Sequence, residues 1–352
     1  MHERSVTQDM ASRVSDVLAR YREPVVAGMR KALDRPGIEH IRYMRYHLGW
    51  DDAEGRTSDG VAGKMLRPAL CLLCCESAGG DPRRVLPAAV SIELLHNFTL
   101  IHDDIEDSSD TRHGRETLWR IAGVPQAINA GDGLFVIAQR TLLDLSGKGV
   151  APERVLQASR MLYDACVELC EGQYRDIGFE GRTVVLLREY ETMIRGKAAV
   201  LLRAACGIGA LIAGAGTATV AAFESYGLAL GLAFQIHDDV LGIWGEPHHT
   251  GKPAGDDIRS RKKSFPIVHA MQHLNAGGQA ELAGIFGDAT VGDEQVGRVL
   301  ELLDECGARE TARKAARRHG DDAIAALRSL DLDQEHRSDL HALATFAVDR
   351  RA

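Results

Sequence analysis

The sequence has few aromatic side chains and no long apolar run. Phe, Trp and Tyr make up 5% of its 352 residues, and alternating β-branched runs, which indicate β-strands, are nearly absent. Because no stretch reaches about 18 uninterrupted apolar residues, we expect no membrane-spanning helix. The opening MHERSVTQDM lacks the apolar core of a signal peptide, and we expect a short tail at residues 1–10. These absences favour a helical protein of the cytoplasm.

An excess of positive charge is also absent. The formal net charge is −8 at pH 7, so the phosphates of a nucleic acid would be repelled on average, and we expect no nucleic-acid partner. Small phosphorylated substrates are not excluded, because a few local cations and metal ions can form a positive pocket in an acidic protein.

The cysteines do not indicate disulfides or a zinc site. Their number, seven, is odd, and they occur in apolar helical settings, as expected of reduced thiols in the cytosol. Cys71 and Cys74 form a C-x-x-C, but no second such pair or histidine pair completes a zinc site. We interpret the cysteines as packing residues.

Helical periodicity covers most of the chain. Apolar residues recur at intervals of three and four in residues 84–105, 121–146, 153–172, 184–214 and 218–244. Segments such as 205–216 and 226–236 are apolar on nearly every side, so they must be buried inside a bundle. The sequence therefore predicts an all-α fold, with one large helical domain over residues 11–352 that becomes more charged towards its C-terminus.

The first acidic cluster follows the apolar run ELLHNFTLI without a break. Asp103 and Asp107 are four residues apart, so a helix places their carboxylates on one face, which Asp104 and Glu106 flank. Clustered carboxylates repel one another unless a cation lies between them, and oxygen ligands with room for water and phosphate suit Mg²⁺. The alternative is a solvated helix end with a charged loop. Basic residues that could bind an anion beside the metal follow at once: Arg112, His113 and Arg115.

A second acidic cluster, Asp238 and Asp239, ends another apolar segment, FQIHDDV. A glycine-containing loop with cations and further aspartates comes next: Lys252, Lys262, Lys263, Asp256 and Asp257. Two acidic helix ends, each followed by cations, suggest two halves of one cavity. In that cavity carboxylates would hold shared metal ions and the cations would hold a diphosphate.

Isolated basic residues give weaker signals. Lys64 and Arg67 in GKMLRP are three apart and can point at one anion, although such pairs are also common on solvated helices. Lys197 interrupts the apolar run around MIRGKAAVLL. It either extends to the surface or reaches a buried anion, and taken alone the first is the more common arrangement.

Together these segments resemble the trans-prenyl diphosphate synthases, the family of farnesyl and geranylgeranyl diphosphate synthases. The resemblance runs from about Gly63 to Pro266, with its motifs in family order. It rests on GKMLRP, DDIED, AINAGD, EGQYRDI, GKAA, FQIHDD and the loop GKPAGDDIRSRKKSFP. It implies an all-α bundle of the isoprenoid synthase type around a deep central cavity, paired into a homodimer.

The resemblance also implies a reaction. An allylic diphosphate would ionise with the help of three Mg²⁺ ions, isopentenyl diphosphate would add to the allylic cation, and a proton would then be lost. The ions would be bound by Asp103, Asp104, Asp107, Asp238 and Asp239. The catalytic residues would be Asp103, Asp107, Asp238 and Lys197. The allylic diphosphate would bind Arg112, Lys197 and Lys252, and Gln235 and Lys262 would also bind substrate. Isopentenyl diphosphate would bind Lys64, Arg67, His96 and His113.

Three positions depart from the family pattern. His113 replaces a second arginine and is expected to weaken or alter the isopentenyl diphosphate site, because histidine is shorter and only partly charged near neutral pH. Gly242 replaces the last aspartate of the second motif, a loss that Mg²⁺ can tolerate because it keeps several waters. Ala198 replaces a frequent threonine and removes a hydroxyl group.

Three functions fit these residues. Lys64, Arg67 and His96 favour a chain-elongating prenyltransferase, because a class I terpene cyclase on the same fold would not need an isopentenyl diphosphate site. His113 mildly favours the cyclase. The third function is a non-catalytic regulatory subunit of a prenyl synthase, but such subunits normally lose metal ligands that this chain retains.

The length of the product depends on the floor of the cavity. Phe98 precedes Asp103 on the same predicted helix by roughly 7.5 Å along the axis, at 1.5 Å per residue, and a ring there could stop a growing chain. Helical phenylalanines are more often ordinary core residues. Phe98 followed by small Thr99 resembles the arrangement in geranylgeranyl diphosphate synthases, so we expect a twenty-carbon product.

Overall fold

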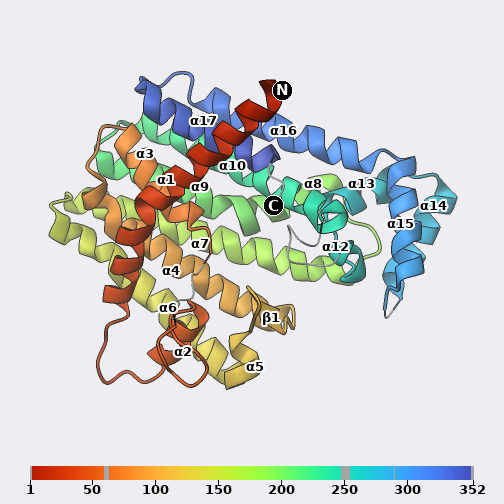
Figure 1. Ribbon diagram of the computed structural model, residues 1–352, viewed down its shortest axis with the longest axis horizontal. Coiled ribbons are helices and arrows are strands. Elements are labelled where there is room, and N and C mark those ends of the chain that lie inside the picture. Colours follow the sequence, from red (N-terminus) through yellow and green to blue (C-terminus); the bar gives the residue numbers. More distant parts are fainter. Residues whose placement is uncertain (1, 59–62, 247–253, 289, 350–352) are drawn as a thin grey trace. The chain divides into compact units, whose positions relative to one another are not determined.

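A computed structural model describes residues 2–58, 63–246, 254–288 and 290–349, with side chains from Met10 onward. Apart from loops, one short hairpin and an isolated bridge between Asp51 and Thr57, the described chain is helical (Figure 1), so the predicted all-α class is confirmed. It divides into two compact units, which we call the N-terminal unit and the C-terminal unit. The N-terminal unit contains Ser12–Leu162 and Ala205–Val220. The C-terminal unit contains Met1–Ala11, Tyr163–Ala204 and Ala221–Ala352.

The N-terminal unit is arranged around α4 (Pro82–Glu106), which packs against α3 (Leu66–Ser77) and α6 (Val124–Leu143). Close packing of α1 (His2–Ala32) on α4 requires glycine at position 28, since a Cβ there would lie 2.6 Å from Val90. The residues predicted as an N-terminal tail belong to α1 from His2 onward. The remaining elements are α2 (Ile41–His47), β1 (Thr111–Arg112), β2 (Arg115–Glu116), α5 (Leu118–Ala122) and η1 (Asp144–Lys148).

Two local features of this unit were not predicted. The helix expected over 121–146 is interrupted at Gly123, whose φ of +80° ends α5 before α6 begins. The antiparallel pair β1 and β2 encloses the two-residue turn His113-Gly114, and both turn residues have positive φ. Such a turn matches the twist of a hairpin, and histidine enters the left-handed region more readily than most side chains.

Helices that cross between the units belong to both. They are α1, which begins in the C-terminal unit, and α7 (Pro152–Glu180), α9 (Val200–Ala213) and α10 (Thr217–Trp244). The C-terminal unit continues with α8 (Leu187–Ile194), the π-helical turn η2 (Arg195–Ala199), α12 (Asp256–Arg259), α13 (Phe265–His273), α14 (Ala276–Gly287), α15 (Asp293–Glu305), α16 (Ala308–Ala326) and α17 (Gln334–Asp349).

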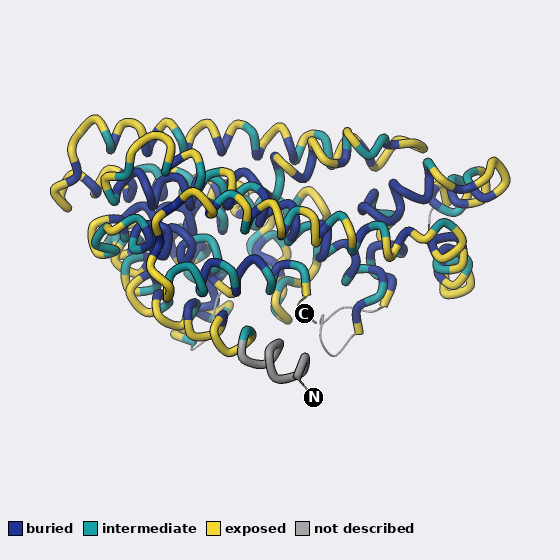
Figure 2. Tube along the Cα trace, turned by 90° about the horizontal axis from the view of Figure 1, so that it is seen from above, coloured by how far each residue is buried: buried dark blue, intermediate teal, exposed yellow. Residues whose placement is uncertain are grey.

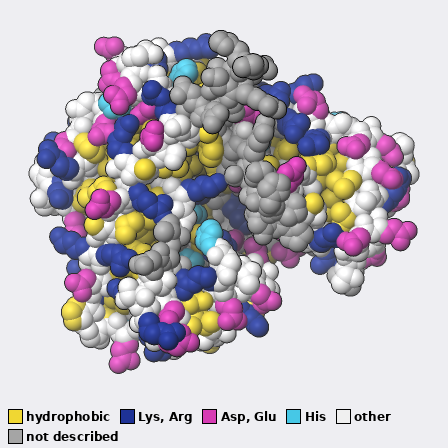
Figure 3. Space-filling model, viewed as in Figure 1, with side chains coloured by type: hydrophobic (Ala, Val, Ile, Leu, Met, Phe, Trp, Pro, Cys, Tyr) yellow, Lys and Arg dark blue, Asp and Glu magenta, His cyan; other side chains and the backbone are white. Residues whose placement is uncertain are grey.

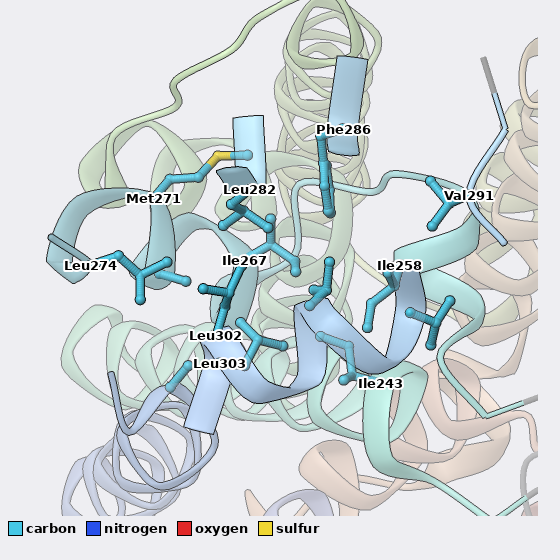
Figure 4. Close-up of a cluster of buried hydrophobic side chains, with 14 residues drawn as sticks. Ile243, Ile258, Ile267, Met271, Leu274, Leu282, Phe286, Val291, Leu302 and Leu303 are labelled. Atoms are coloured by element: carbon cyan, nitrogen blue, oxygen red, sulfur yellow. The ribbon is translucent and has the colours of Figure 1, made fainter. Parts of the chain in front are cut away.

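The core of the C-terminal unit is formed where several short helices converge. Figure 4 shows Ile243 of α10 and Ile258 of α12 directed towards Ile267 of α13 and Leu302 of α15, and all four side chains are buried. Burying aliphatic side chains of this size stabilises a fold by about 1.5–3 kcal/mol each. This core fixes the segment that follows the second acidic cluster.

Burial and charge follow the expected amphipathic pattern. Many helices alternate between buried and exposed residues along their length (Figure 2), as helices with one face on a core do. On the face seen in Figure 3, acidic and basic side chains are interspersed. The net negative charge is therefore not gathered in one large patch on that face.

Three helical stretches have the length and mean hydropathy of a membrane crossing: Pro82–Glu106, Leu187–Ala213 and Thr217–Trp244. Inside the protein, 67%, 78% and 50% of their most apolar windows are buried. Helices in the middle of a large bundle have this composition because few of their sides face water. The absence of a membrane-spanning segment stays a prediction.

Candidate active site

The first acidic cluster lies at the C-terminal end of α4, in the N-terminal unit. Asp103 is half-buried, Asp107 is exposed, and the backbone N–H of Asp107 donates to the carbonyl of Asp103, so the predicted helical spacing is present. The negative end of the helix dipole adds to the charge of the carboxylates. This arrangement favours a bound cation.

Asp104 differs from its neighbours because it is 2% exposed. Its Oδ1 accepts a hydrogen bond from Nε of Arg112 at 2.8 Å, while Nη2 of Arg112 lies 3.5 Å from Asp103. Burial raises the pKa of Asp104, and the contact with Arg112 opposes that shift. Its buried Oδ2 has no hydrogen-bond partner among the described residues. The hairpin thus places Arg112 beside the first acidic cluster.

Arg115 fixes the hairpin and also lines the cavity described below. Its guanidinium donates to the carbonyls of Tyr46 at 3.0 Å and Asp51 at 2.7 Å, and it stacks on the Tyr46 ring at 4.2 Å. A cavity of about 160 Å³ lies nearby and is lined by His47, Asp104, Arg112 and His113, among others. Burial lowers the pKa of His113, and the charge on Arg112 lowers it further, so this imidazole is neutral near pH 7.

The predicted isopentenyl diphosphate residues are placed as follows. Nη1 of Arg67 lies 3.1 Å from Nε2 of His96. Burial lowers the pKa of His96 well below its ordinary value, and the charge on Arg67 lowers it further, so the neutral ring can accept this bond. Lys64 precedes α3, separated from it by Met65 in the left-handed conformation. The shared-helix geometry assumed for Lys64 and Arg67 is therefore absent, and their action on one anion stays a prediction.

The second acidic cluster lies on α10, in the C-terminal unit, and the helix continues past it to Trp244. Asp238 is half-buried and Asp239 is 1% exposed. The structure also explains Gly242. A Cβ at this position would lie 2.5 Å from the carboxylate of Asp257, so an aspartate there would collide with that group and repel it.

Lys197 is presented by the π-helical turn η2, a type of irregularity often found at functional sites. Its ammonium lies 2.5 Å from Oδ2 of Asp176 on α7. The two segments approach so closely that a Cβ on Gly172 would lie 2.2 Å from the backbone nitrogen of Lys197. Gly172 therefore permits the contact between Asp176, one turn further along α7, and Lys197.

A cavity of about 60 Å³ in the C-terminal unit brings several predicted residues together. Its lining includes Lys197, Gln235, Asp239 and Lys262 with Asp176, Tyr190, Met193, Ile194 and Ala198. Burial alone would lower the pKa of Lys262, but the charges on Asp239, Asp257 and Asp176 raise it above its ordinary value. Lys197 and protonated Lys262 therefore line one small, partly apolar space. Lys252, predicted beside them, lies outside the described residues.

The carboxylate oxygens of the two clusters can be compared with the ligands that Mg²⁺ usually takes in proteins. Within the described ranges, no three His, Cys, Asp or Glu side chains are arranged to enclose a metal ion. Mg²⁺ does not need such an enclosure, because it is usually held by one or two carboxylates together with water and substrate phosphates. Accessible Asp103, Asp107 and Asp238, with the unpartnered oxygen of Asp104, fit that mode.

Some residues at these sites were not predicted from the sequence. Tyr190 lies far from both acidic motifs and gave no signal. His47 also precedes every motif, and burial, with Arg112, lowers its pKa to about 3. Asp176 lies within EGQYRDI, so that motif was the signal that could have identified it.

Comparisons with known proteins agree with the resemblance. The family model described as polyprenyl synthetase matches residues 57–303. A (2E,6E)-farnesyl diphosphate synthase of Mycobacterium tuberculosis is 39% identical over 97% of this chain and 95% of its own length. A geranylgeranyl diphosphate synthase of the same organism is 42% identical over 80% of this chain and 79% of its own length.

Solved structures agree as well. A polyprenyl synthetase from Streptomyces coelicolor A3(2) superposes with a TM-score of 0.89 at 38% identity and covers 96% of this chain and 100% of its own. A geranylgeranyl pyrophosphate synthase from Corynebacterium glutamicum, solved with isoprenyl diphosphate and magnesium, has a TM-score of 0.77 at 27% identity, covering 98% of each chain.

Proposed function

Because the chain belongs to the polyprenyl synthetase family and is a trans-prenyltransferase that lengthens prenyl diphosphates, we propose how its residues divide the work. The observation that carries the proposal is the repeated pairing of an aspartate cluster with a cation. Asp104 holds Arg112, and Asp239 holds Lys262. The two clusters would act on one allylic diphosphate, with isopentenyl diphosphate as the second substrate.

The metal ions would be held by the accessible aspartates. Asp103 and Asp107 would bind from α4 and Asp238 from α10, three ions in all, with the diphosphate oxygens and water as the other ligands. When bound, Mg²⁺ neutralises the charge that develops on the leaving pyrophosphate. The magnesium-bound structure of the Corynebacterium relative supports this proposal.

Cations of the protein would complete the allylic diphosphate site. Lys197 and Lys262 face the 60 Å³ cavity, and Arg112 lies beside the first cluster. Charge-assisted hydrogen bonds from such groups stabilise an oxyanion more as its charge grows, which favours ionisation over binding alone. Met193 and Ile194 line the same cavity and would keep water from the allylic cation.

Isopentenyl diphosphate would bind at Lys64, Arg67 and His96, with His113 at the edge. The neutral rings of His96 and His113 offer hydrogen bonds and no fixed charge, so most of the attraction would come from Lys64 and Arg67. No side chain need abstract the last proton, because the released pyrophosphate can accept it.

We further propose a twenty-carbon product. Similar relatives include both farnesyl and geranylgeranyl synthases, so the length must be argued from the residues below Asp103. The Phe98 ring lies 5.2 Å from the ring of Phe135 and 5.0 Å from that of His102. A ring held by two neighbours is a firmer stop than one held by none.

The protein would act as a homodimer in the cytoplasm. Exposed apolar side chains follow one face of α7 at intervals of three, four and seven: Leu156, Tyr163, Val167, Tyr174 and Ile177. Val167 is 69% exposed and Tyr174 is 74% exposed, which is unusual for an apolar stripe unless another chain covers it. Light scattering should then give twice the chain mass of 38.2 kDa. The free cysteines fit a reducing compartment.

Product analysis tests the proposed function. Purified protein with Mg²⁺ is given allylic diphosphates of five, ten or fifteen carbons, with and without isopentenyl diphosphate, and the prenyl products are separated by chain length. We expect a longer prenyl diphosphate only when both substrates are present. A cyclic hydrocarbon formed without isopentenyl diphosphate would indicate a terpene cyclase, and no product in any mixture would indicate a regulatory subunit.

A further inference from the structure

The carboxylate of Asp239 is almost completely enclosed in the C-terminal unit. Oδ2 accepts hydrogen bonds from the hydroxyl of Tyr190 at 2.5 Å and from the backbone N–H of Phe265 at 2.9 Å. Oδ1 accepts from Nε2 of Gln235 at 3.0 Å and from the ammonium of Lys262 at 3.2 Å. Four donors from different parts of the chain therefore meet on one side chain.

These bonds leave little room for a metal ion at Asp239. A carboxylate offers about four lone-pair positions, and each of its two oxygens already has two donors. A metal on either oxygen would displace a donor, and the buried hydroxyl of Tyr190 or the N–H of Phe265 would then lose its partner at a cost in stability. Asp238, one residue earlier, is only half-buried.

We propose that Asp239 is a positioning residue, which holds the ammonium of Lys262 at the wall of the 60 Å³ cavity, and that it is not a metal ligand. This inference rests on the proposed role of Lys262 in binding the diphosphate. It reassigns one of the five aspartates that the sequence predicted as metal ligands and leaves the ions to Asp103, Asp107 and Asp238.

In this geometry a charged carboxylate at position 239 holds the ammonium of Lys262 in place. Lys262 is anchored on one side by Asp239 and approached on the other by Asp257 at 3.9 Å. Lys197 is held separately by Asp176. Each ammonium of the cavity thus has its own carboxylate, so a diphosphate meets two lysines in fixed positions. Asparagine at 239 would keep the size but remove the charge and place donors where the carboxylate only accepts.

Calorimetry of inorganic pyrophosphate binding over a series of Mg²⁺ concentrations tests the proposal, using the whole chain without turnover. Asp238→Asn should raise the Mg²⁺ concentration needed for half-maximal binding at least about tenfold. Asp239→Asn should leave that concentration within about twofold and weaken pyrophosphate binding about tenfold, the loss expected of one charge-assisted hydrogen bond. Because Asp239 acts through Lys262, Asp239→Asn should add little to Lys262→Met in the double variant.

Tyr190→Phe keeps the test decisive if Asp239→Asn does not fold. It removes one donor from Oδ2 and leaves the contact with Lys262. A positioning role predicts a lower midpoint of thermal unfolding with unchanged Mg²⁺ dependence. A ligand role predicts that the freed oxygen binds Mg²⁺ more tightly.

Two results would overturn the inference: an equal shift in Mg²⁺ dependence for Asp239→Asn and Asp238→Asn, or full additivity of Asp239→Asn with Lys262→Met. Because pyrophosphate binding needs no product, failure of the proposed function would be detected separately, by the product analysis.

Discussion

The two aspartate pairs have the same local sequence, Ile-His-Asp-Asp, and similar burial. The carboxylates of their second aspartates nevertheless accept different numbers of hydrogen bonds. In each pair the first residue, Asp103 or Asp238, is half-buried and the second, Asp104 or Asp239, is buried. Each second residue binds a cation, Arg112 or Lys262. Asp239 has donors on both oxygens, whereas one oxygen of Asp104 has none among the described residues.

The comparison shows how one dipeptide can carry two tasks. Successive residues of a helix point about 100° apart, so one carboxylate can face an open site while its neighbour faces the core. In the proposed site the more exposed carboxylate would bind a metal ion, and the buried one holds a cation beside it. One oxygen of Asp104 has no hydrogen-bond partner among the described residues, whereas both oxygens of Asp239 have donors.

The largest effect is expected when the more exposed aspartate of either pair is replaced. Asp103→Ala or Asp238→Ala should lower the rate of product formation by at least about a hundredfold, the scale of one lost electrostatic element. Both variants should stay folded, because removing one of several mutually repelling carboxylates does not harm the apoprotein. Steady-state kinetics and circular dichroism measure the two outcomes.

Asp164→Ala is the control, since it removes an exposed carboxylate of α7 outside both clusters. It should leave the rate unchanged. Near-normal turnover in Asp103→Ala or Asp238→Ala would reject the assignment of that aspartate to catalysis.

The next largest effect concerns the helix packing that places Lys197. Gly172→Ala would push a methyl group into the backbone of Lys197 and Gly196. We expect a loss of about 1–3 kcal/mol in the free energy of unfolding, as for other overpacked sites, together with weaker pyrophosphate binding. Urea unfolding and calorimetry measure these.

Gly178→Ala on the same helix is the matched control, because a Cβ there meets nothing within 4 Å. It should stabilise the protein by about 0.5–1 kcal/mol, since alanine favours a helix more than glycine. Equal effects of the two substitutions would show that the close approach of α7 to η2 is not what places Lys197.

Much of the fold was predictable because helical periodicity reports which faces are buried. Segments 84–105 and 218–244 agree with α4 and α10 within a few residues. The site was less predictable where it depends on contacts between distant segments. The four donors on Asp239 come from positions 190, 235, 262 and 265, and no local pattern reveals which aspartate of a pair turns inward.

Backbone irregularities were missed for a related reason. The π-helical turn that presents Lys197 and the left-handed turn at His113 change a few torsion angles without changing the apolar pattern. His113 nevertheless offered a clue, since a histidine-glycine pair between short polar segments suits a two-residue hairpin. The family resemblance suggested roles for these residues, but not their conformations.

A smaller effect is expected at His113, in the hairpin beside the first acidic cluster. His113→Arg replaces a neutral imidazole with a permanent guanidinium and should lower the KM for isopentenyl diphosphate several-fold, with little change for the allylic substrate. Because φ is +52° at this position, the arginine should also cost about 1 kcal/mol of stability. Initial-rate kinetics and thermal unfolding separate the two effects.

His113→Asn is the companion variant. Asparagine tolerates the left-handed region but carries no charge, so it should keep the stability and bring no gain in affinity. An unchanged KM in His113→Arg would mean that position 113 does not face isopentenyl diphosphate.

The smallest expected effect on rate, and the sharpest on product, concerns the region below the first cluster. Phe98 on α4 contacts Phe135 on α6 and His102, and these two rings limit the space into which its own ring can turn. Phe98→Ala should deepen the cavity and shift the products beyond twenty carbons. Asp103 and Asp107 are untouched, so the rate of product formation should fall only a few-fold. Chromatography of the dephosphorylated products measures their length.

Phe135→Ala tests whether Phe135 is itself part of the cavity floor or only holds the Phe98 ring in position. If the growing chain meets the Phe98 ring itself, loss of Phe135 should broaden the product lengths less than loss of Phe98, because the first ring remains but is held less firmly. If both rings form the floor, the two variants should lengthen the product equally. The same length distribution as wild type in Phe98→Ala would mean that the floor lies elsewhere. The aromatic contact would then be ordinary core packing, which is the usual role of a helical phenylalanine.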